Sequence, residues 1–109
     1  MGLTKTQIFS KEQNELAVLL KAMAHPARIA ILQQIIGSNA CICGDLVDEL
    51  GLAQATISQH LKELKKAGII QGTIEGVKTC YCIEPKTWKR LQDRFADLMS
   101  AHKGDVNCC

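Results

Sequence analysis

The six cysteines have the most distinctive chemistry in this chain, and they occur as three close pairs. The pairs are Cys41 with Cys43, Cys80 with Cys82, and Cys108 with Cys109. Thiolates bind soft metal ions, and thiols also undergo reversible oxidation. The N-terminal residues lack the apolar run of a secretory signal, so we expect a cytoplasmic protein. In that reducing compartment, clustered cysteines indicate metal binding or redox chemistry more often than structural disulfide bonds.

The length and composition of the chain favour one folded domain and exclude several classes of function. Its 109 residues, 47% apolar and 22% charged, suit a single globular core. The net charge of +2 excludes a polycation, and an aromatic fraction of 4% argues against a stacking surface for single-stranded nucleic acid. No segment has the roughly 18 apolar residues that a membrane span needs. Paired acid–base residues and a phosphate-binding loop are also missing, so we expect neither an enzyme nor a membrane protein.

Apolar spacing predicts two helices in the first third of the chain. The first begins after Ser10, which stands three residues before Gln13 as in a capping box. Its apolar stripe is Leu16, Leu19, Leu20 and Met23. The second helix begins at Pro26 and stops at Gly37. Its expected stripe is Ile29, Leu32, Ile35 and Ile36.

A helix-turn-helix is predicted in the middle of the chain. Residues 40–43 are too few for a helix and predict a small extended segment. A short helix over residues 45–50 is followed by a longer one that ends at Gly68. The buried stripe of the longer helix is Ile57, Leu61 and Leu64. Two helices joined by about three residues that include glycine are typical of a helix-turn-helix.

A β-hairpin and a last helix complete the expected domain. Residues 69–75 and 78–83 alternate in polarity around Gly76, which predicts a hairpin. Its inward residues are Ile70, Ile74, Tyr81 and Ile83, and Cys80 and Cys82 therefore point outward. Pro85 begins the last helix, whose apolar face is Trp88, Leu91, Phe95, Leu98 and Met99. We expect one domain over residues 10–102, an N-terminal arm over 1–9, and a tail over 103–109 that carries Cys108 and Cys109.

Two segments resemble one family of bacterial repressors. Residues 20–32 (LKAMAHPARIAIL) and 51–69 (GLAQATISQHLKELKKAGI) are similar to the opening signature and the recognition helix of the ArsR/SmtB family of metal- and metalloid-responsive repressors. The resemblance implies a mainly α winged helix-turn-helix with a small β-hairpin wing, in the order α-α-(β)-α-α-β-β-α. It also implies a homodimer that binds an imperfect palindromic operator in double-stranded DNA. The implied dimer contacts, on the first and last helices, are Leu16, Leu20, Phe95, Leu98 and Met99.

The recognition helix supplies most of the expected DNA contacts. Its face opposite the buried stripe carries short polar side chains and lysines, which suit base edges and phosphates in a major groove. The hairpin wing adds one cation. The candidate DNA-binding residues are Gln54, Ala55, Thr56, Ser58, Gln59, Lys62, Lys65 and Lys78. His60 adjoins Leu61 and is expected to pack or bond locally.

The first cysteine pair lies close to the family's arsenite-binding position but is displaced from it. Arsenite-sensing relatives carry Cys-Val-Cys-Asp-Leu at the start of the third helix, whereas residues 41–46 here are Cys-Ile-Cys-Gly-Asp-Leu. Aligned on Asp-Leu, the two thiolate positions are occupied by Ile42 and Gly44. A shift of one residue turns a strand side chain to the opposite face. Cys41 and Cys43 could equally be small buried apolar residues.

The sequence leaves open whether the first two cysteine pairs lie on the same face of the sheet. In winged helices the short strand pairs with the returning wing strand, which would bring residues 41–43 beside residues 80–83. If both pairs share one face, four thiols form a site for arsenite or a soft divalent metal ion. If the first pair points inward, the two pairs lie on opposite faces. The tail pair, Cys108 and Cys109, could instead complete a site with the first pair of either protomer. No obligatory cofactor is expected.

The expected function is repression of a promoter until a thiol-reactive inducer, such as arsenite or a soft metal ion, lowers the affinity for DNA. The family's zinc site on the last helix is disfavoured, because no histidine stands two residues after Asp93. One alternative is a redox- or persulfide-responsive repressor that uses Cys43 with Cys108, or the adjacent tail pair. Another is a thiol module for metal buffering or protein interaction that has kept the fold without specific DNA binding.

Overall fold

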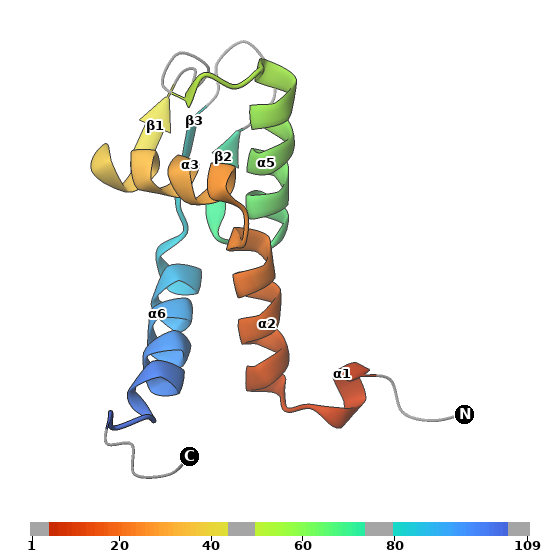
Figure 1. Ribbon diagram of the computed structural model, residues 1–109. Coiled ribbons are helices and arrows are strands. Elements are labelled where there is room, and N and C mark those ends of the chain that lie inside the picture. The colour runs from red at the N-terminus through yellow and green to blue at the C-terminus, as the bar shows by residue number, and fades with distance from the viewer. Residues whose placement is uncertain (1–4, 44–49, 74–79, 105–109) are drawn as a thin grey trace.

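A small sheet with two helices against it forms one end of the molecule, and two further helices extend together from the other end (Figure 1). The computed structural model describes residues 5–43, 50–73 and 80–104. The elements are α1 (Lys5–Ile8), α2 (Lys11–Met23), α3 (Pro26–Gly37), β1 (Cys41–Cys43), α5 (Gln54–Lys66), β2 (Ile70–Thr73), β3 (Cys80–Ile83) and α6 (Pro85–Ser100). This order confirms the predicted mainly α winged helix-turn-helix. In the described part of the chain, no helix is long and apolar enough to cross a membrane.

Two expectations about the elements need comment. The predicted arm over residues 1–9 contains the short helix α1, which no periodicity in the sequence indicated. The predicted helix over residues 45–50 lies outside the described residues except for its last residue, and the hairpin bend at Gly76 lies wholly outside them.

Local signals in the sequence determine where the helices begin. The Ser10 hydroxyl accepts a hydrogen bond from the Gln13 amide at 3.0 Å, and the Gln13 side chain accepts one from the Ser10 amide at 2.9 Å. This reciprocal pair is the predicted capping box. At α6 the Glu84 carboxylate accepts the Thr87 amide at 2.7 Å, and this bond lowers the pKa of Glu84. The predicted helix starts after Ser10 and at Pro26 and Pro85 are therefore confirmed.

The sheet is antiparallel, and its strand order is β1-β3-β2. β1 pairs with β3 so that Cys41 faces Cys82 and Cys43 faces Cys80. β2 pairs with β3 from Ile70 opposite Ile83 to Thr73 opposite Cys80. The central strand β3 therefore joins the hairpin to the strand that follows α3.

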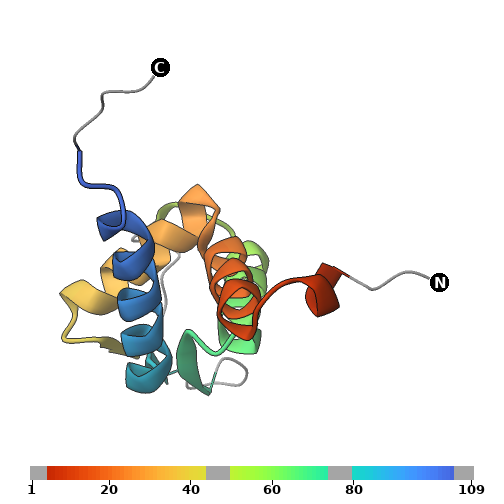
Figure 2. The ribbon, with the colours of Figure 1, turned by 90° about the horizontal axis from the view of Figure 1, so that it is seen from below.

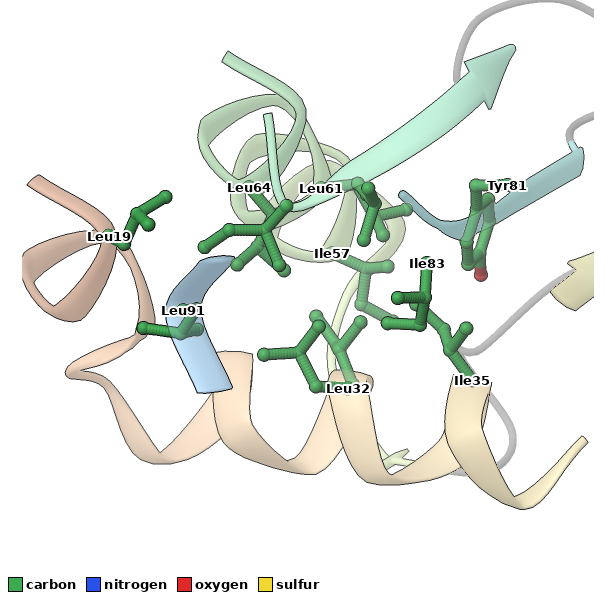
Figure 3. Packing of buried hydrophobic residues seen from close by; sticks show 12 residues of the cluster. Leu19, Leu32, Ile35, Ile57, Leu61, Leu64, Tyr81, Ile83 and Leu91 are labelled. Atoms are coloured by element: carbon green, nitrogen blue, oxygen red, sulfur yellow. The ribbon is translucent and has the colours of Figure 1, made fainter. Parts of the chain in front are cut away.

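The core forms where α3 and α5 pack on the inner face of this sheet (Figure 3). Four helices and two strands contribute buried apolar side chains. They are Leu19 from α2, Ile31, Leu32 and Ile35 from α3, Ile57, Leu61 and Leu64 from α5, Ile69 directly before β2 and Ile70 at its start, Tyr81 and Ile83 from β3, and Leu91 from α6. The predicted stripe of α5 and the predicted inward residues of β3 are confirmed.

The stripe predicted for α3 is only half correct. Leu32 and Ile35 are buried, but Ile29 and Ile36 are 46% and 49% exposed, and the fully buried Ile31 was not in the prediction. The helix contacts α5, β1 and β3. The side of α3 that is buried is therefore the side that contacts these three elements. Ile29 and Ile36 lie outside that side and stay exposed.

An ion pair joins the two extended helices. Arg94 of α6 donates a hydrogen bond to the Glu15 carboxylate of α2 at 2.8 Å, and Arg90 lies 3.6 Å from the same oxygen. The bond from Arg94, helped by the charge of Arg90, lowers the pKa of Glu15 although partial burial opposes the shift. The pair therefore holds α2 and α6 side by side from the pH at which Glu15 ionises upward.

A polar contact holds α5 against the start of α3. Arg28 donates one hydrogen bond to Nδ1 of His60 at 3.1 Å and another to the carbonyl of Ala22 at 3.0 Å. The ring of His60 lies 4.5 Å from that of His25, whose own Nδ1 caps α3. Burial, followed by the nearby charges of His25 and Arg28, lowers the pKa of His60. The neutral imidazole is the form that accepts the bond from Arg28.

The first prediction concerns Gly72, whose φ is 126°. A Cβ atom at this position would overlap the Cys80 carbonyl oxygen and lie 2.7 Å from the Cα atom of Tyr81. We expect Gly72→Ala to lower the free energy of unfolding by about 2 kcal/mol or more, measured by urea denaturation at fixed protein concentration. The matched control is Gly37→Ala in α3, where a Cβ atom meets nothing within 4 Å. An equal loss in both variants would contradict the prediction.

The second prediction concerns the pH dependence of stability. Because the pKa of His60 is lowered in the folded chain, the unfolded chain binds more protons below about pH 6.5. The contribution of His60 to stability is therefore complete above that pH and falls as the pH is lowered below it. We expect His60→Asn, which keeps an acceptor for Arg28 but does not titrate, to reduce the slope of unfolding free energy against pH. The wild type, measured in the same buffers, gives the reference slope. An unaltered slope in His60→Asn would rule out this role for His60.

Candidate nucleic-acid interface and cysteine ladder

The outward face of α5 is a strip of small polar side chains. The helix is anchored by its buried stripe, and Gln54, Ala55, Thr56, Gln59 and Lys62 are exposed while Ser58 is half-buried. Together with Lys65, which is exposed farther along the helix, seven of the eight predicted DNA-binding residues therefore lie on this helix. Short side chains of this kind reach base edges when a helix enters a major groove.

Hydrogen bonds along α5 hold two of these side chains in place. The amide of Gln54 donates to the Ser58 hydroxyl at 3.3 Å, and the amide of Gln59 donates to the Glu63 carboxylate at 3.2 Å. Both bonds join residues four apart, so they run along the helix, and each uses the amide nitrogen as the donor. The arrangement pre-orients the glutamines, whose amides can bond adenine in two places.

The two ends of α5 offer different groups to a phosphate: backbone amides at the start and lysine side chains at the end. The N-cap is Ala53, which makes no side-chain capping bond, and the first turn has no acidic residue. The cap residue therefore satisfies none of the first amides of the helix with its side chain, and such amides suit a phosphate. At the other end Lys65 donates to the Gly72 carbonyl at 2.7 Å, which ties α5 to β2. The Gly72 carbonyl therefore competes with a phosphate for the ammonium group of Lys65. The other predicted cation, Lys78, lies outside the described residues.

His60 is turned away from this face. It is half-buried and accepts the bond from Arg28, as the prediction of a local partner required. The partner itself was not predicted, because Arg28 stands 32 residues away in another helix.

The four cysteines of the sheet form two directly opposed pairs, which we call the cysteine ladder: Cys41, Cys43, Cys80 and Cys82. Each pair is disulfide-bonded, Cys41 to Cys82 and Cys43 to Cys80, with Cα atoms 4.0 and 4.1 Å apart. Cys41, Cys43 and Cys80 are exposed and Cys82 is half-buried. Both rungs of the ladder lie on the outer face of the sheet, because Tyr81 on the opposite face is buried.

This arrangement decides between the two alternatives left open by the sequence. The cysteine pairs share one face, and the interpretation of Cys41 and Cys43 as small buried apolar residues is wrong. The sequence left the oxidation state of the thiols open, and in this structure these four cysteines form two disulfide bonds. Ile42 between the two cysteines is the less exposed residue of β1, as expected when side chains alternate between the two faces of a strand.

The remaining cysteine hypotheses are affected in different ways. Cys43 is bonded to Cys80, so a pairing of Cys43 with Cys108 does not occur in this structure. Cys108 and Cys109 themselves lie outside the described residues. Among the described residues, no group of three or more histidine, cysteine or acidic side chains is placed to hold a metal ion. In this structure the ladder therefore consists of two separate disulfide bonds.

Exposed apolar side chains lie along the second half of α6, the helix that runs beside α2 (Figure 2). Phe95, Leu98 and Met99 of α6 are 41%, 56% and 60% exposed, as expected for contacts with a second copy. Leu16 and Leu20, also predicted for that interface, are half-buried against the core of the same chain. Beside them is an almost wholly apolar groove of about 410 Å³. It is lined by Leu20, Met23, Ala24, Ile29, Trp88, Leu91, Gln92 and Phe95.

Known proteins share both the sequence and the fold. Residues 25–71 match the family model described as "Bacterial regulatory protein, arsR family". The repressor SmtB of Mycobacterium tuberculosis is 46% identical over 63 residues, which are 58% of this chain and 46% of that protein. The match thus spans about half the length of that relative.

Two further comparisons extend over more of the chain. The biofilm growth-associated repressor of Agrobacterium fabrum is 37% identical over 91 residues, which cover 84% of this chain and 71% of that protein. The solved structure of HlyU from Vibrio cholerae has a TM-score of 0.65 at 28% identity and covers 84% of this chain and 99% of that one. With this identity across most of both chains and the matching winged helix-turn-helix, the chain belongs to the ArsR family of bacterial regulatory proteins.

Proposed function

We propose that this protein is a homodimeric transcriptional repressor that binds an imperfect palindromic operator in double-stranded DNA. The observation that carries the proposal is the polar outer face of α5, which is fixed by a buried stripe on the opposite side of the same helix. In the bound state α5 enters the major groove, where Gln54, Ser58 and Gln59 contact base edges. Lys62 and the uncapped first turn of α5 contact phosphates. In this proposal the repressor acts in the cytoplasm and does not bind a membrane.

Two copies are needed because one α5 reads only one half of a palindromic operator. The exposed apolar residues of α6 supply the contact, since Phe95, Leu98 and Met99 leave a surface that water solvates poorly. The ion pair of Glu15 with Arg94 keeps α2 beside α6 within each protomer. Dimerisation then buries the ends of both helices and sets the spacing of the two recognition helices.

The affinity for the operator falls when a thiol-reactive inducer reacts with the cysteines. Arsenite or a soft divalent metal ion suits the reduced ladder, where four thiols share one face. A redox-responsive repressor is the second candidate, and the two cross-strand disulfides favour it. A thiol module that does not bind a specific DNA sequence has no comparable support, because it gives no role to the polar face of α5.

The third prediction tests the DNA interface. An operator is first selected from random duplexes with the wild-type protein. We expect the variant Gln54→Ala/Ser58→Ala/Gln59→Ala to bind it at least about tenfold more weakly by fluorescence anisotropy, because bidentate base contacts are lost. Gln33→Ala, an exposed glutamine of α3, is the control and should bind like the wild type. If the triple variant keeps full affinity while its thermal unfolding is unchanged, the repressor function is wrong.

The fourth prediction tests the dimer. Leu98→Glu/Met99→Glu places two carboxylates on the exposed apolar end of α6, where they would have to lose water on association. Sedimentation should find this variant monomeric at concentrations where the wild type is a dimer, and its operator affinity should fall with it. The control is Asp97→Asn, which changes the polar residue directly before Leu98; this variant should remain dimeric. A monomeric wild type, or a dimeric double variant, would contradict the proposed interface.

A further inference from the structure

The cysteine ladder has a geometry that the DNA interface does not explain. Its four thiols come from strands that are far apart in sequence, since the bonded pairs are separated by 41 and 37 residues. The register nevertheless puts each cysteine directly opposite another one. Both rungs lie on the outer face of the sheet, where they add nothing to the buried core.

We propose that the cysteine ladder is a two-rung dithiol–disulfide switch, oxidised by hydroperoxides, that controls the affinity of the protein for its operator. This inference rests on the proposed repressor function and names the chemistry that regulates it. Disulfides on an exposed surface in a reducing compartment form and reopen as conditions change, and they differ in this from structural bridges.

The oxidation can be written for each rung. In the rung of Cys41 and Cys82, Cys41 is exposed and Cys82 half-buried, so Cys41 reacts first. Its thiolate attacks the hydroperoxide, the O–O bond breaks, an alcohol leaves, and Cys41 becomes a sulfenic acid. Cys82 then attacks the sulfenic sulfur, the S–O bond breaks, and water leaves as the disulfide forms. Two thiols and one hydroperoxide thus give one disulfide, one alcohol and one water, with two electrons passed to the hydroperoxide.

The second rung is oxidised with the same stoichiometry, but its two thiols do not have a fixed order of reaction. Cys43 and Cys80 are both exposed, so either thiol can react first. A dithiol reductant reverses each rung by thiol–disulfide exchange and is itself oxidised to a disulfide.

The position of β1 explains how the rungs reach the DNA interface. β1 has three residues, and its pairing in the sheet is with β3. Strands this short hold their place weakly by backbone pairing, whereas two covalent rungs fix the strand at both ends. Ten residues lie between β1 and α5, and β3 is also the return strand of the wing. The oxidised ladder therefore links the strand that precedes the helix-turn-helix covalently to a strand of the wing.

The fifth prediction has a chemical part and a DNA-binding part. Reduced wild-type protein is treated with an alkyl hydroperoxide and mapped by peptide mass spectrometry. We expect links from Cys41 to Cys82 and from Cys43 to Cys80, each with the loss of two hydrogens. The same links should form in Cys108→Ser/Cys109→Ser. Links within one strand or to the tail as the main products would overturn the proposal.

In the DNA-binding part, oxidation should weaken binding to the selected operator by about 5- to 150-fold, and dithiothreitol should restore it. The tail variant Cys108→Ser/Cys109→Ser is the matched control and should respond in full. A variant with all four ladder cysteines changed to serine should bind the operator but ignore hydroperoxide. If circular dichroism shows that this variant is unfolded, the alanine version replaces it, and the mapping of the wild type still tests the ladder.

The outcomes separate this inference from the function on which it rests. If the reduced protein does not bind any selected operator, the repressor function fails, and the switch fails with it. If the reduced protein binds and both rungs form without a change in affinity, only the switch is wrong. Release by arsenite but not by hydroperoxide would likewise reject the switch and leave the repressor. A response that persists without the ladder cysteines would assign it to other residues.

Discussion

The apolar stripe of α5, formed by Ile57, Leu61 and Leu64, is buried between α3 and the sheet, and this burial decides which side of the helix faces outward. Each such side chain contributes about 1.5–3 kcal/mol when it is buried. Rotating the helix would expose all three at once, so the polar face is fixed in direction. The bonds from Arg28 to His60 and from Lys65 to Gly72 then tie the helix to its neighbours on either side.

Most of the framework could be predicted from short-range signals. The capping box at Ser10, the prolines at 26 and 85 and the stripe of α5 each depend on residues within one or two turns of a helix. The outer face of α5 was predictable for the same reason, because it is the complement of a regular stripe. The inward direction of Tyr81 followed from strand alternation.

The errors arose where two distant segments decide the outcome together. Ile29 and Ile36 satisfy helical spacing but fall outside the arc that α3 buries against three other elements. The bond from Arg28 to His60 joins two helices, and no local pattern indicates it. For Cys41 and Cys43, strand alternation was available, but a strand of three residues gives too short a pattern to choose a face without its partner.

The register between β1 and β3 also constrains how this sequence can change over time. Losing one ladder cysteine leaves the thiol opposite it exposed or half-exposed and without its bonded neighbour. Position 41 is therefore expected to vary together with 82, and 43 together with 80, although neighbours along each strand vary independently. Inserting or deleting one residue inside either strand would turn part of that strand over and separate the pairs. Each rung therefore constrains two positions on different strands to change together during evolution.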